Sequence, residues 1–165
     1  MSGLRPILLL LTLALAACGS PSPRGDAVSE YSAPRGPAAS PLGQEIALFA
    51  LGLMDTGYRF GGKNPQAGLD CSGMVSYVYQ QSAGIRLTGS AAEQARAGRV
   101  VDREGLRPGD LVFFNTRKQP LSHVGIYIGE ARFVHAPAST GKVRIDRLDS
   151  PYFAQRYETA RTYFD

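Results

Sequence analysis

The sequence contains few of the residues that mark nucleic-acid binders or disulfide-rich folds. Its 165 residues include two cysteines, two histidines and no tryptophan, and no run of Lys or Arg exceeds two residues. The net charge of +4 is mild and lacks the dense basic stripe of a nucleic-acid-binding protein. We therefore expect no nucleic-acid partner. A hydrophobic content of 44% with 19% charged residues is ordinary for one globular domain.

The apolar run near the N-terminus is also short. Ile7 to Ala17 is uncharged, but it falls well below the roughly 20 residues that span a bilayer. With Arg5 before it and small residues leading to Cys18, the run predicts a lipoprotein signal peptide over residues 1–17 and lipidation of Cys18. The alternative is an ordinary signal peptide cleaved near Ala17, with Cys18 incidental.

The segment after Cys18 has the composition of a tether. In residues 19–40, Pro, Gly, Ser and Ala fill 16 of 22 positions, which leaves too little apolar surface for a core. We expect residues 18–40 to carry the lipid and the tether, and residues 41–165 to form one domain. Lipidation of Cys18 would exclude a disulfide with Cys71. Cys71 would then be a free thiol in an oxidising compartment, where such a thiol is either buried or used.

The domain begins with helical patterns and continues with strand patterns. Ser40, Asp70 and Ser90 are N-cap residues, and Gly57, Gly84 and Gly98 are the expected helix ends. Short β-branched and aromatic runs then predict strands at 111–114, 124–128, 132–135, 143–145 and near 159–164. This order indicates an α+β fold, an antiparallel sheet with helices packed on one face.

Cys71 stands at the predicted start of the second helix. The partial positive charge and free N–H groups of a helix N-terminus favour a thiolate over a thiol. The same groups could stabilise an oxyanion on a substrate carbonyl. The alternative is a small buried cysteine that belongs to the core.

The two histidines lie at the ends of consecutive predicted strands. His123 opens one strand and His135 closes the next, so an antiparallel pairing would bring them together. His123 could then take the proton of Cys71, and His135 could orient His123. The alternatives are two unrelated strand-end histidines, or a zinc site, for which no further ligands stand at suitable spacing.

Four segments in this order resemble the NlpC/P60 family of cell-wall cysteine peptidases. They are Asp-Cys-Ser-Gly at 70–73, Leu-Arg-Pro-Gly-Asp-Leu-Val-Phe-Phe at 106–114, His-Val-Gly-Ile-Tyr-Ile-Gly at 123–129 and Phe-Val-His-Ala at 133–136. The resemblance implies a papain-like NlpC fold with the nucleophile at a helix N-terminus and no cofactor. It assigns Cys71 as nucleophile, His123 as general base and His135 as the orienting residue.

The resemblance also suggests substrate-binding residues. Tyr58 matches a family tyrosine whose hydroxyl can help bind the oxyanion, and Asp70 and Ser72 match positions beside the peptide stem. Each also has a purely structural explanation: Asp70 as a helix cap, Ser72 as an exposed first-turn residue and Tyr58 as a loop aromatic.

The C-terminal residues 151–161 resemble the Spr-like lipoprotein subgroup of murein endopeptidases. The implied activity is hydrolysis of an amide bond in peptidoglycan peptide stems, with the D-alanyl–diaminopimelate cross-link favoured over the D-glutamyl–diaminopimelate bond. An N-acetylmuramoyl-L-alanine amidase, a lipid-linked acyltransferase and a non-catalytic wall-binding lipoprotein are the alternatives. By analogy with these lipoproteins, Gly19 after Cys18, in place of Asp, favours the outer membrane of a bacterial envelope, facing the periplasm. The oligomeric state and any regulatory protein stay open.

The lipid anchor can be tested directly. Cys18→Ser removes the expected lipidation site, so the full-length variant should leave the membrane fraction and enter the soluble fraction of cells, with its activity on soluble fragments retained. Fractionation followed by immunodetection measures this. A Ser20→Ala variant is the matched control and should stay with membranes. Membrane retention of the Cys18→Ser protein would contradict the anchor.

Overall fold

The computed structural model describes residues 40–165, so the predicted signal peptide, Cys18 and residues 19–39 of the tether lie outside the described residues. Within the described part, three helices precede most of the strands, as the sequence predicts: α1 (Pro41–Leu51), α2 (Cys71–Ala83) and α3 (Ala91–Ala97). Across residues 40–165, no helix has both the length and the apolar character needed to cross a membrane.

Six antiparallel strands form one sheet in the order β3-β8-β4-β5-β6-β7. Their bounds are β3 (Arg99–Val101), β4 (Leu111–Phe114), β5 (His123–Gly129), β6 (Arg132–His135), β7 (Arg144–Arg147) and β8 (Tyr157–Thr162). The sequence predicted five of these strands to within a few residues. It missed β3, the small hairpin of β1 (Lys63–Asn64) and β2 (Gly68–Leu69), the 3-10 turn η1 (Arg103–Gly105) and the short helix α4 (Pro151–Ala154).

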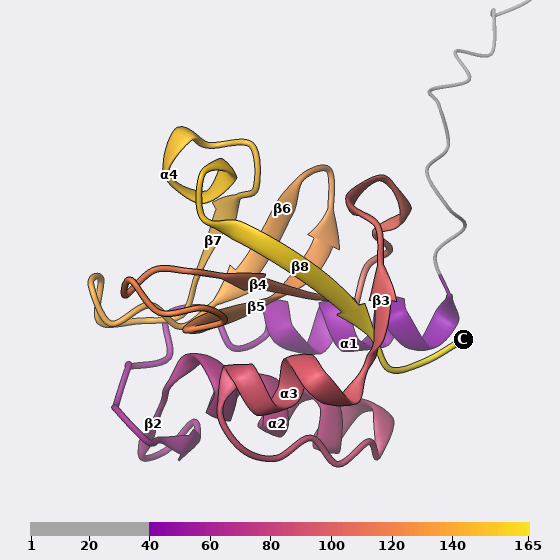
Figure 1. Ribbon diagram of the computed structural model, residues 1–165. Coiled ribbons are helices and arrows are strands. Elements are labelled where there is room, and N and C mark those ends of the chain that lie inside the picture. Colours follow the sequence, from indigo (N-terminus) through magenta and orange to yellow (C-terminus); the bar gives the residue numbers. More distant parts are fainter. Residues whose placement is uncertain (1–39) are drawn as a thin grey trace, which may run out of the picture. The chain divides into compact units, whose positions relative to one another are not determined.

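The α+β fold is confirmed, with α1, α2 and α3 on one face of the sheet (Figure 1). Side chains alternate between the two faces of a strand. Phe113 and Val124 therefore join the helices in one core, while Phe114 and Phe133 face the other way. The helix that the sequence missed, α4, covers that second face with Phe153, whose ring centroid lies 4.9 Å from that of Phe133. Helices are thus not confined to one face.

The caps confirm two of the three predicted helix ends. Gly84 ends α2 in the left-handed conformation, with φ of 66°, and α3 is followed by Gly98. The predicted end of α1 at Gly57 is wrong, because α1 ends at Leu51. Apolar residues continue at helical spacing to Leu53. After Leu51, however, the chain forms tighter turns, in which the backbone N–H of Leu53 donates to the carbonyl of Ala50.

Gly73, in the first turn of α2, allows the preceding loop to approach the helix closely. A Cβ at this position would lie 1.9 Å from the carbonyl oxygen of Gly62, far inside van der Waals contact. Gly62 also accepts a backbone hydrogen bond from Asp70, at 3.1 Å. The loop that carries Tyr58 is therefore held against the start of α2 by backbone contacts.

We predict that Gly73→Ala destabilises the domain, because the added methyl must displace this loop. Overpacking of this kind costs about 1–3 kcal/mol. Urea unfolding of the full-length protein measures the change. Gly57→Ala is the matched control, because no atom lies within 4 Å of a Cβ at that position. A Gly73→Ala protein as stable as the Gly57→Ala control would contradict the close approach.

Candidate active site

Asp70 sets the position of Cys71, because its carboxylate joins the start of α2 to the preceding loop. One oxygen accepts from the backbone N–H of Gly73 at 2.7 Å, and the other accepts from that of Gly61 at 2.9 Å. The hydroxyl of Ser72 donates to the same carboxylate at 3.1 Å. Cys71, the first residue of α2, is 5% exposed. The cap therefore holds the thiol at a defined place beside the sheet.

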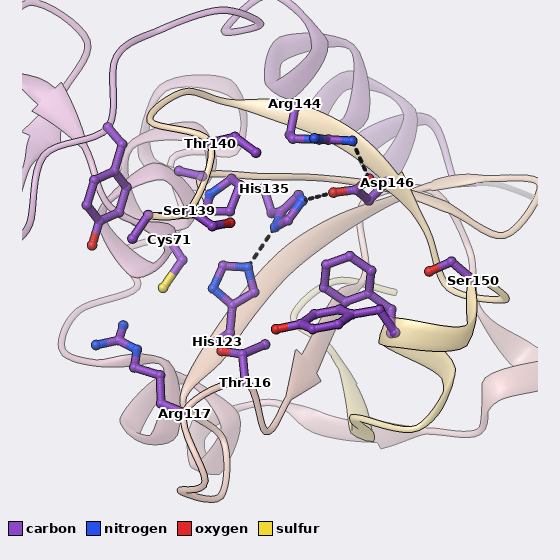
Figure 2. Close-up of a pocket in the computed structure, with 16 residues that line it drawn as sticks. Cys71, Thr116, Arg117, His123, His135, Ser139, Thr140, Arg144, Asp146 and Ser150 are labelled. Atoms are coloured by element: carbon purple, nitrogen blue, oxygen red, sulfur yellow. Dashed lines mark hydrogen bonds and ion pairs between the residues drawn. The ribbon is translucent and has the colours of Figure 1, made fainter.

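His123 and His135 come together across the pair of strands β5 and β6, as the sequence predicted. The Nε2 atom of His123 lies 2.7 Å from Nδ1 of His135, and the two residues are 6% and 1% exposed. Gly125 allows the side chains of β6 to pack closely over β5, since a Cβ there would lie 2.5 Å from the Phe133 ring and 3.2 Å from the Cβ of His135. Cys71 lines the same cavity as both histidines, and Figure 2 shows a ring nitrogen of His123 on the side where Cys71 lies.

The neighbouring strand β7 adds two residues that the sequence analysis missed. Nε2 of His135 lies 2.8 Å from Oδ2 of Asp146, and Arg144 donates to Oδ1 of Asp146 at 2.7 Å. The alternation of Arg144 and Asp146 was visible in the sequence. The predicted strand, however, stopped at residue 145, and nothing indicated that it would pair with β6.

Burial controls the ionisation of the thiol and the imidazole that it faces. It raises the pKa of the Cys71 thiol above its ordinary value, and the Asp70 carboxylate acts in the same direction. Backbone N–H groups of Val124 and Ser72 beside the sulfur offset this shift only in part. Burial also lowers the pKa of His123, to about 3. Both shifts favour a neutral thiol and a neutral imidazole at neutral pH.

Burial thus opposes the thiolate that the helix N-terminus is expected to favour in the free protein. A helix N-terminus supplies about half a positive charge. Burial disfavours the charged form of a thiol. For Cys71, which is 5% exposed, this effect on the pKa outweighs that of the neighbouring N–H groups. We therefore expect any proton transfer from Cys71 to His123 to accompany a chemical step instead of preceding substrate binding.

The thiol and both histidines line a cavity of about 470 Å³. Its wall continues through β7 to α4 and includes a loop of small residues, and the members other than the three already named are Tyr58, Thr116, Arg117, Ala136, Pro137, Ala138, Ser139, Thr140, Arg144, Asp146, Ser150, Tyr152 and Phe153. Tyr58, a candidate for oxyanion binding, therefore lies in the same cavity as the thiol. Asp70 and Ser72 do not line it, and their side chains bond each other at the helix cap.

Metal ligation has no support in the described part of the chain. Among residues 40–165, no group of three or more His, Cys, Asp or Glu side chains is arranged so that it could hold a metal ion. Four polar residues of the cavity, His123, His135, Asp146 and Arg144, are instead connected to one another by hydrogen bonds.

Comparison with known proteins identifies related domains. The sequence profile of the NlpC/P60 family matches residues 55–162. The chain is 44% identical over 107 residues to a gamma-DL-glutamyl hydrolase of Bacillus subtilis, covering 64% of this chain and 26% of the relative. It is 43% identical over 104 residues to the murein DD-endopeptidase MepS/murein LD-carboxypeptidase of Escherichia coli, covering 63% and 54%.

Two further comparisons extend over more of the chain. The probable endopeptidase NlpC of Escherichia coli is 35% identical over 163 residues, covering 94% of this chain and 96% of the relative. The crystal structure of an NlpC/P60 family protein from Bacillus cereus superposes with a TM-score of 0.68 at 30% identity, covering 78% of this chain and 41% of that one. The first two relatives are thus matched over about half of their length or less.

The ionisation of Cys71 leads to a testable pH dependence. Because burial raises the pKa of the thiol, the rate of alkylation by iodoacetamide should reach its midpoint at a higher pH than for a free cysteine peptide. Mass spectrometry of the Cys71 peptide follows this thiol separately from Cys18. The urea-unfolded chain is the control, and its midpoint should return to the ordinary value. A folded-state midpoint below that of the free peptide would show that the helix N-terminus prevails.

Proposed function

Since the chain belongs to the NlpC/P60 family, we propose that it hydrolyses an amide bond in the peptide stems or cross-links of peptidoglycan. In this proposal Cys71 is the nucleophile, His123 the general base and His135 the residue that orients His123. The observation that carries the proposal is the buried thiol at a helix N-terminus, facing a histidine that is itself hydrogen-bonded to a second histidine in a cavity wall.

The reaction follows from the neutral thiol and imidazole. As the sulfur attacks the carbonyl carbon, its proton moves to His123, so the buried site never holds an isolated thiolate. The tetrahedral oxyanion collapses to a thioester, and the leaving amine takes the proton back from His123. Water then loses a proton to His123 and attacks the thioester, which releases the stem and restores the thiol.

Oxyanion stabilisation falls to the first turn of α2 and to Tyr58. The N–H of Gly73 is bonded to the Asp70 carboxylate and that of Met74 to the Asp70 carbonyl. This leaves the N–H groups of Cys71 and Ser72 as the donors of that turn nearest the nucleophile. The Tyr58 hydroxyl is a further donor in the cavity, and its raised pKa, which results from burial, keeps it protonated at neutral pH.

The proposal for the bond is the D-alanyl–diaminopimelate cross-link. It is supported by the C-terminal resemblance and by a relative named murein DD-endopeptidase. The D-glutamyl–diaminopimelate bond is the second candidate, because another relative is named a gamma-DL-glutamyl hydrolase. We further propose that the protein works in the cell envelope, where the lipid on Cys18 attaches it to the outer membrane and the tether lets the domain reach the wall.

Digestion of purified cross-linked muropeptide dimers tests the activity and the bond together. We expect the full-length protein to release monomers with intact tetrapeptides, as detected by chromatography and mass spectrometry. Cys71→Ala should reduce the rate by at least about 10³-fold, because it removes the atom that forms the thioester. Cys18→Ser is the matched control, because it removes the other cysteine and should retain the activity.

The other outcomes assign the remaining functions. Stems shortened to dipeptides would identify the D-glutamyl–diaminopimelate bond, and release of whole stems from glycan would identify an amidase. A transferred acyl group without hydrolysis would identify an acyltransferase. Binding to sacculi that is unchanged by Cys71→Ala, with no turnover by either protein, would contradict an enzymatic function.

A further inference from the structure

We propose that Asp146, held by Arg144, is a positioning residue that fixes the tautomers of both histidines so that His123 presents an unprotonated nitrogen to Cys71. The inference rests on the proposed role of His123 as the base. Nothing in the sequence patterns assigned a role to Asp146, and it stands on the edge strand of the sheet, two strands away from His123.

Hydrogen bonds connect Asp146 at the sheet edge to His135, and His135 to His123, which lines the same cavity as Cys71. Asp146 contacts His135 at 2.8 Å, and His135 contacts His123 at 2.7 Å (Figure 2). Each histidine uses one ring nitrogen toward its neighbour on either side, and Figure 2 shows Nδ1 of His123 turned toward Cys71. A proton placed at one contact therefore determines where the protons lie at the next.

The carboxylate determines the direction of this series. Burial raises the pKa of Asp146, but hydrogen bonds from His135 and Arg144 outweigh it, so the pKa lies below the ordinary value and the group is ionised at neutral pH. An ionised carboxylate only accepts hydrogen bonds. Nε2 of His135 must therefore carry a proton and donate a hydrogen bond to Asp146.

The remaining positions follow from the chemistry of a neutral imidazole, in which one nitrogen donates and the other accepts. With its proton on Nε2, His135 has a bare Nδ1, so Nε2 of His123 must donate to it. Nδ1 of His123 is then bare and can accept the thiol proton. If the series ran in the opposite direction, Nδ1 of His123 would carry a proton and could not act as a base.

No other ionisable side chain competes for His135 within the part of the chain that the structure describes. On β5 it faces His123, on β7 it faces Asp146 and Arg144, and from α4 the ring of Phe153 packs against it at a centroid distance of 5.4 Å. Burial lowers the pKa of His135 and Asp146 opposes this shift, so the ring stays neutral at pH 7.

Arg144 makes the identity of residue 146 decisive. Its guanidinium can only donate, and it donates to Oδ1 of Asp146 at 2.7 Å. In an Asp146→Asn protein, Arg144 selects the amide oxygen, which turns the amide NH2 toward His135. The amide would then donate to Nε2 of His135, and the whole series of protons would invert. Asp146→Ala removes the acceptor without imposing this inversion.

Nitrogen NMR of the full-length protein, labelled in histidine, reads the tautomers directly. The chain has only two histidines, so the long-range proton–nitrogen spectrum holds two rings. At pH 7 we expect both rings of the wild type to be protonated at Nε2, and both rings of Asp146→Asn to be protonated at Nδ1. The same tautomers in both proteins would overturn the proposal.

Kinetics supply the second readout. We expect kcat to fall about 10²-fold or more for Asp146→Asn, and by less for Asp146→Ala, although asparagine is the closer replacement. Adding Arg144→Met to Asp146→Asn frees the amide to turn its oxygen toward His135, so part of the lost activity should return. Asp146→Asn as active as Asp146→Ala, or no recovery in the double variant, would contradict the inference.

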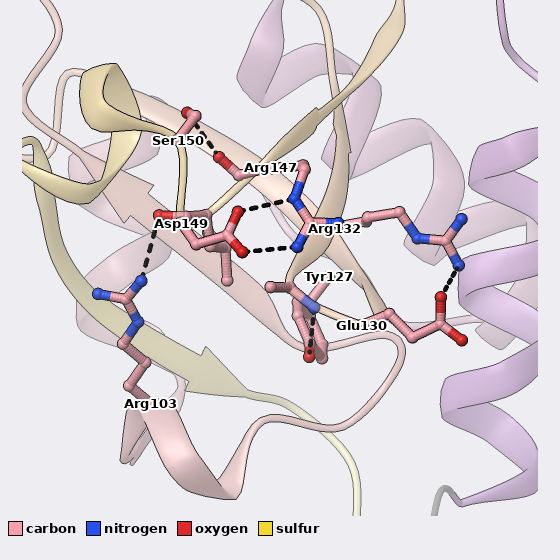
Figure 3. Close-up of polar contacts among 9 residues, drawn as sticks. Arg103, Tyr127, Glu130, Arg132, Arg147, Asp149 and Ser150 are labelled. Carbon is pink, nitrogen blue, oxygen red and sulfur yellow. Dashed lines mark hydrogen bonds and ion pairs between the residues drawn. The ribbon is translucent and has the colours of Figure 1, made fainter.

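Asp149→Asn is the matched control. Asp149 lies three residues further along and pairs with Arg147 at the surface, at 2.7 and 2.5 Å (Figure 3). The Asp149→Asn variant loses the same charge beside an arginine, but at a residue that contacts no histidine. It should therefore keep the wild-type kcat and the wild-type histidine tautomers. Because the NMR experiment needs no substrate, the expected tautomers in a protein that cuts no peptidoglycan would refute the proposed function and leave this inference standing.

Discussion

The hydrogen bonds of the Asp70 carboxylate are the interaction on which the site depends. One side chain caps α2, binds the backbone of the preceding loop and receives the hydroxyl of Ser72. Because the loop also carries Tyr58, the cap relates the proposed nucleophile to the proposed oxyanion donor. The close approach of Gly73 to Gly62 acts in the same direction, since a larger residue would separate the two segments. The motif Asp-Cys-Ser-Gly thus combines a cap, a reactive atom, a partner of the cap and a backbone contact.

Burial gives the site its electrostatic character. The core that packs α2 against the sheet buries the thiol, and aromatic rings of the other core, those of Phe114 and Phe153, pack against His123 and His135. Burial raises the pKa of Cys71 and lowers that of His123. Both shifts favour a neutral thiol beside a neutral imidazole over a thiolate and imidazolium pair. In the proposed reaction the proton passes between two neutral groups, which works only if the receiving nitrogen is unprotonated. The hydrogen bonds behind His123 consequently matter as much as its distance from the sulfur.

The sequence predicted those parts of the fold that local chemistry determines. The N-caps at Asp70 and Ser90, the αL glycine at Gly84 and the alternation in β5 and β6 are local patterns, and each was found. The juxtaposition of His123 and His135 followed from a hairpin, which is also local. The end of α1, the edge strand β3 and the helix α4 depend on tertiary contacts, so short-range patterns did not reveal them.

The same distinction explains what was missed in the site. The raised pKa of Cys71 depends on how completely the neighbouring elements bury the thiol. The sequence of a capped helix start contains no information on that burial. Asp146 and Arg144 are reached by His135 only because β7 pairs with β6 after a loop of eight residues, 136–143. The resemblance of motifs identified three candidate residues and contained no information on a fourth, because the contact belongs to strand pairing and not to a motif.

The place of Asp146 at the edge of the sheet reconciles two conflicting requirements. The group that orients His135 must stay ionised, yet full burial raises the pKa of a carboxyl and would neutralise it. The side chain of Asp146 remains 23% exposed while that of His135 is 1% exposed, and Arg144 supplies a positive charge on the solvent side. On an interior strand, the carboxylate would be as buried as the imidazole that it contacts. The edge strand lets a charged acceptor touch a buried imidazole, and the direction of the proton series follows from that geometry.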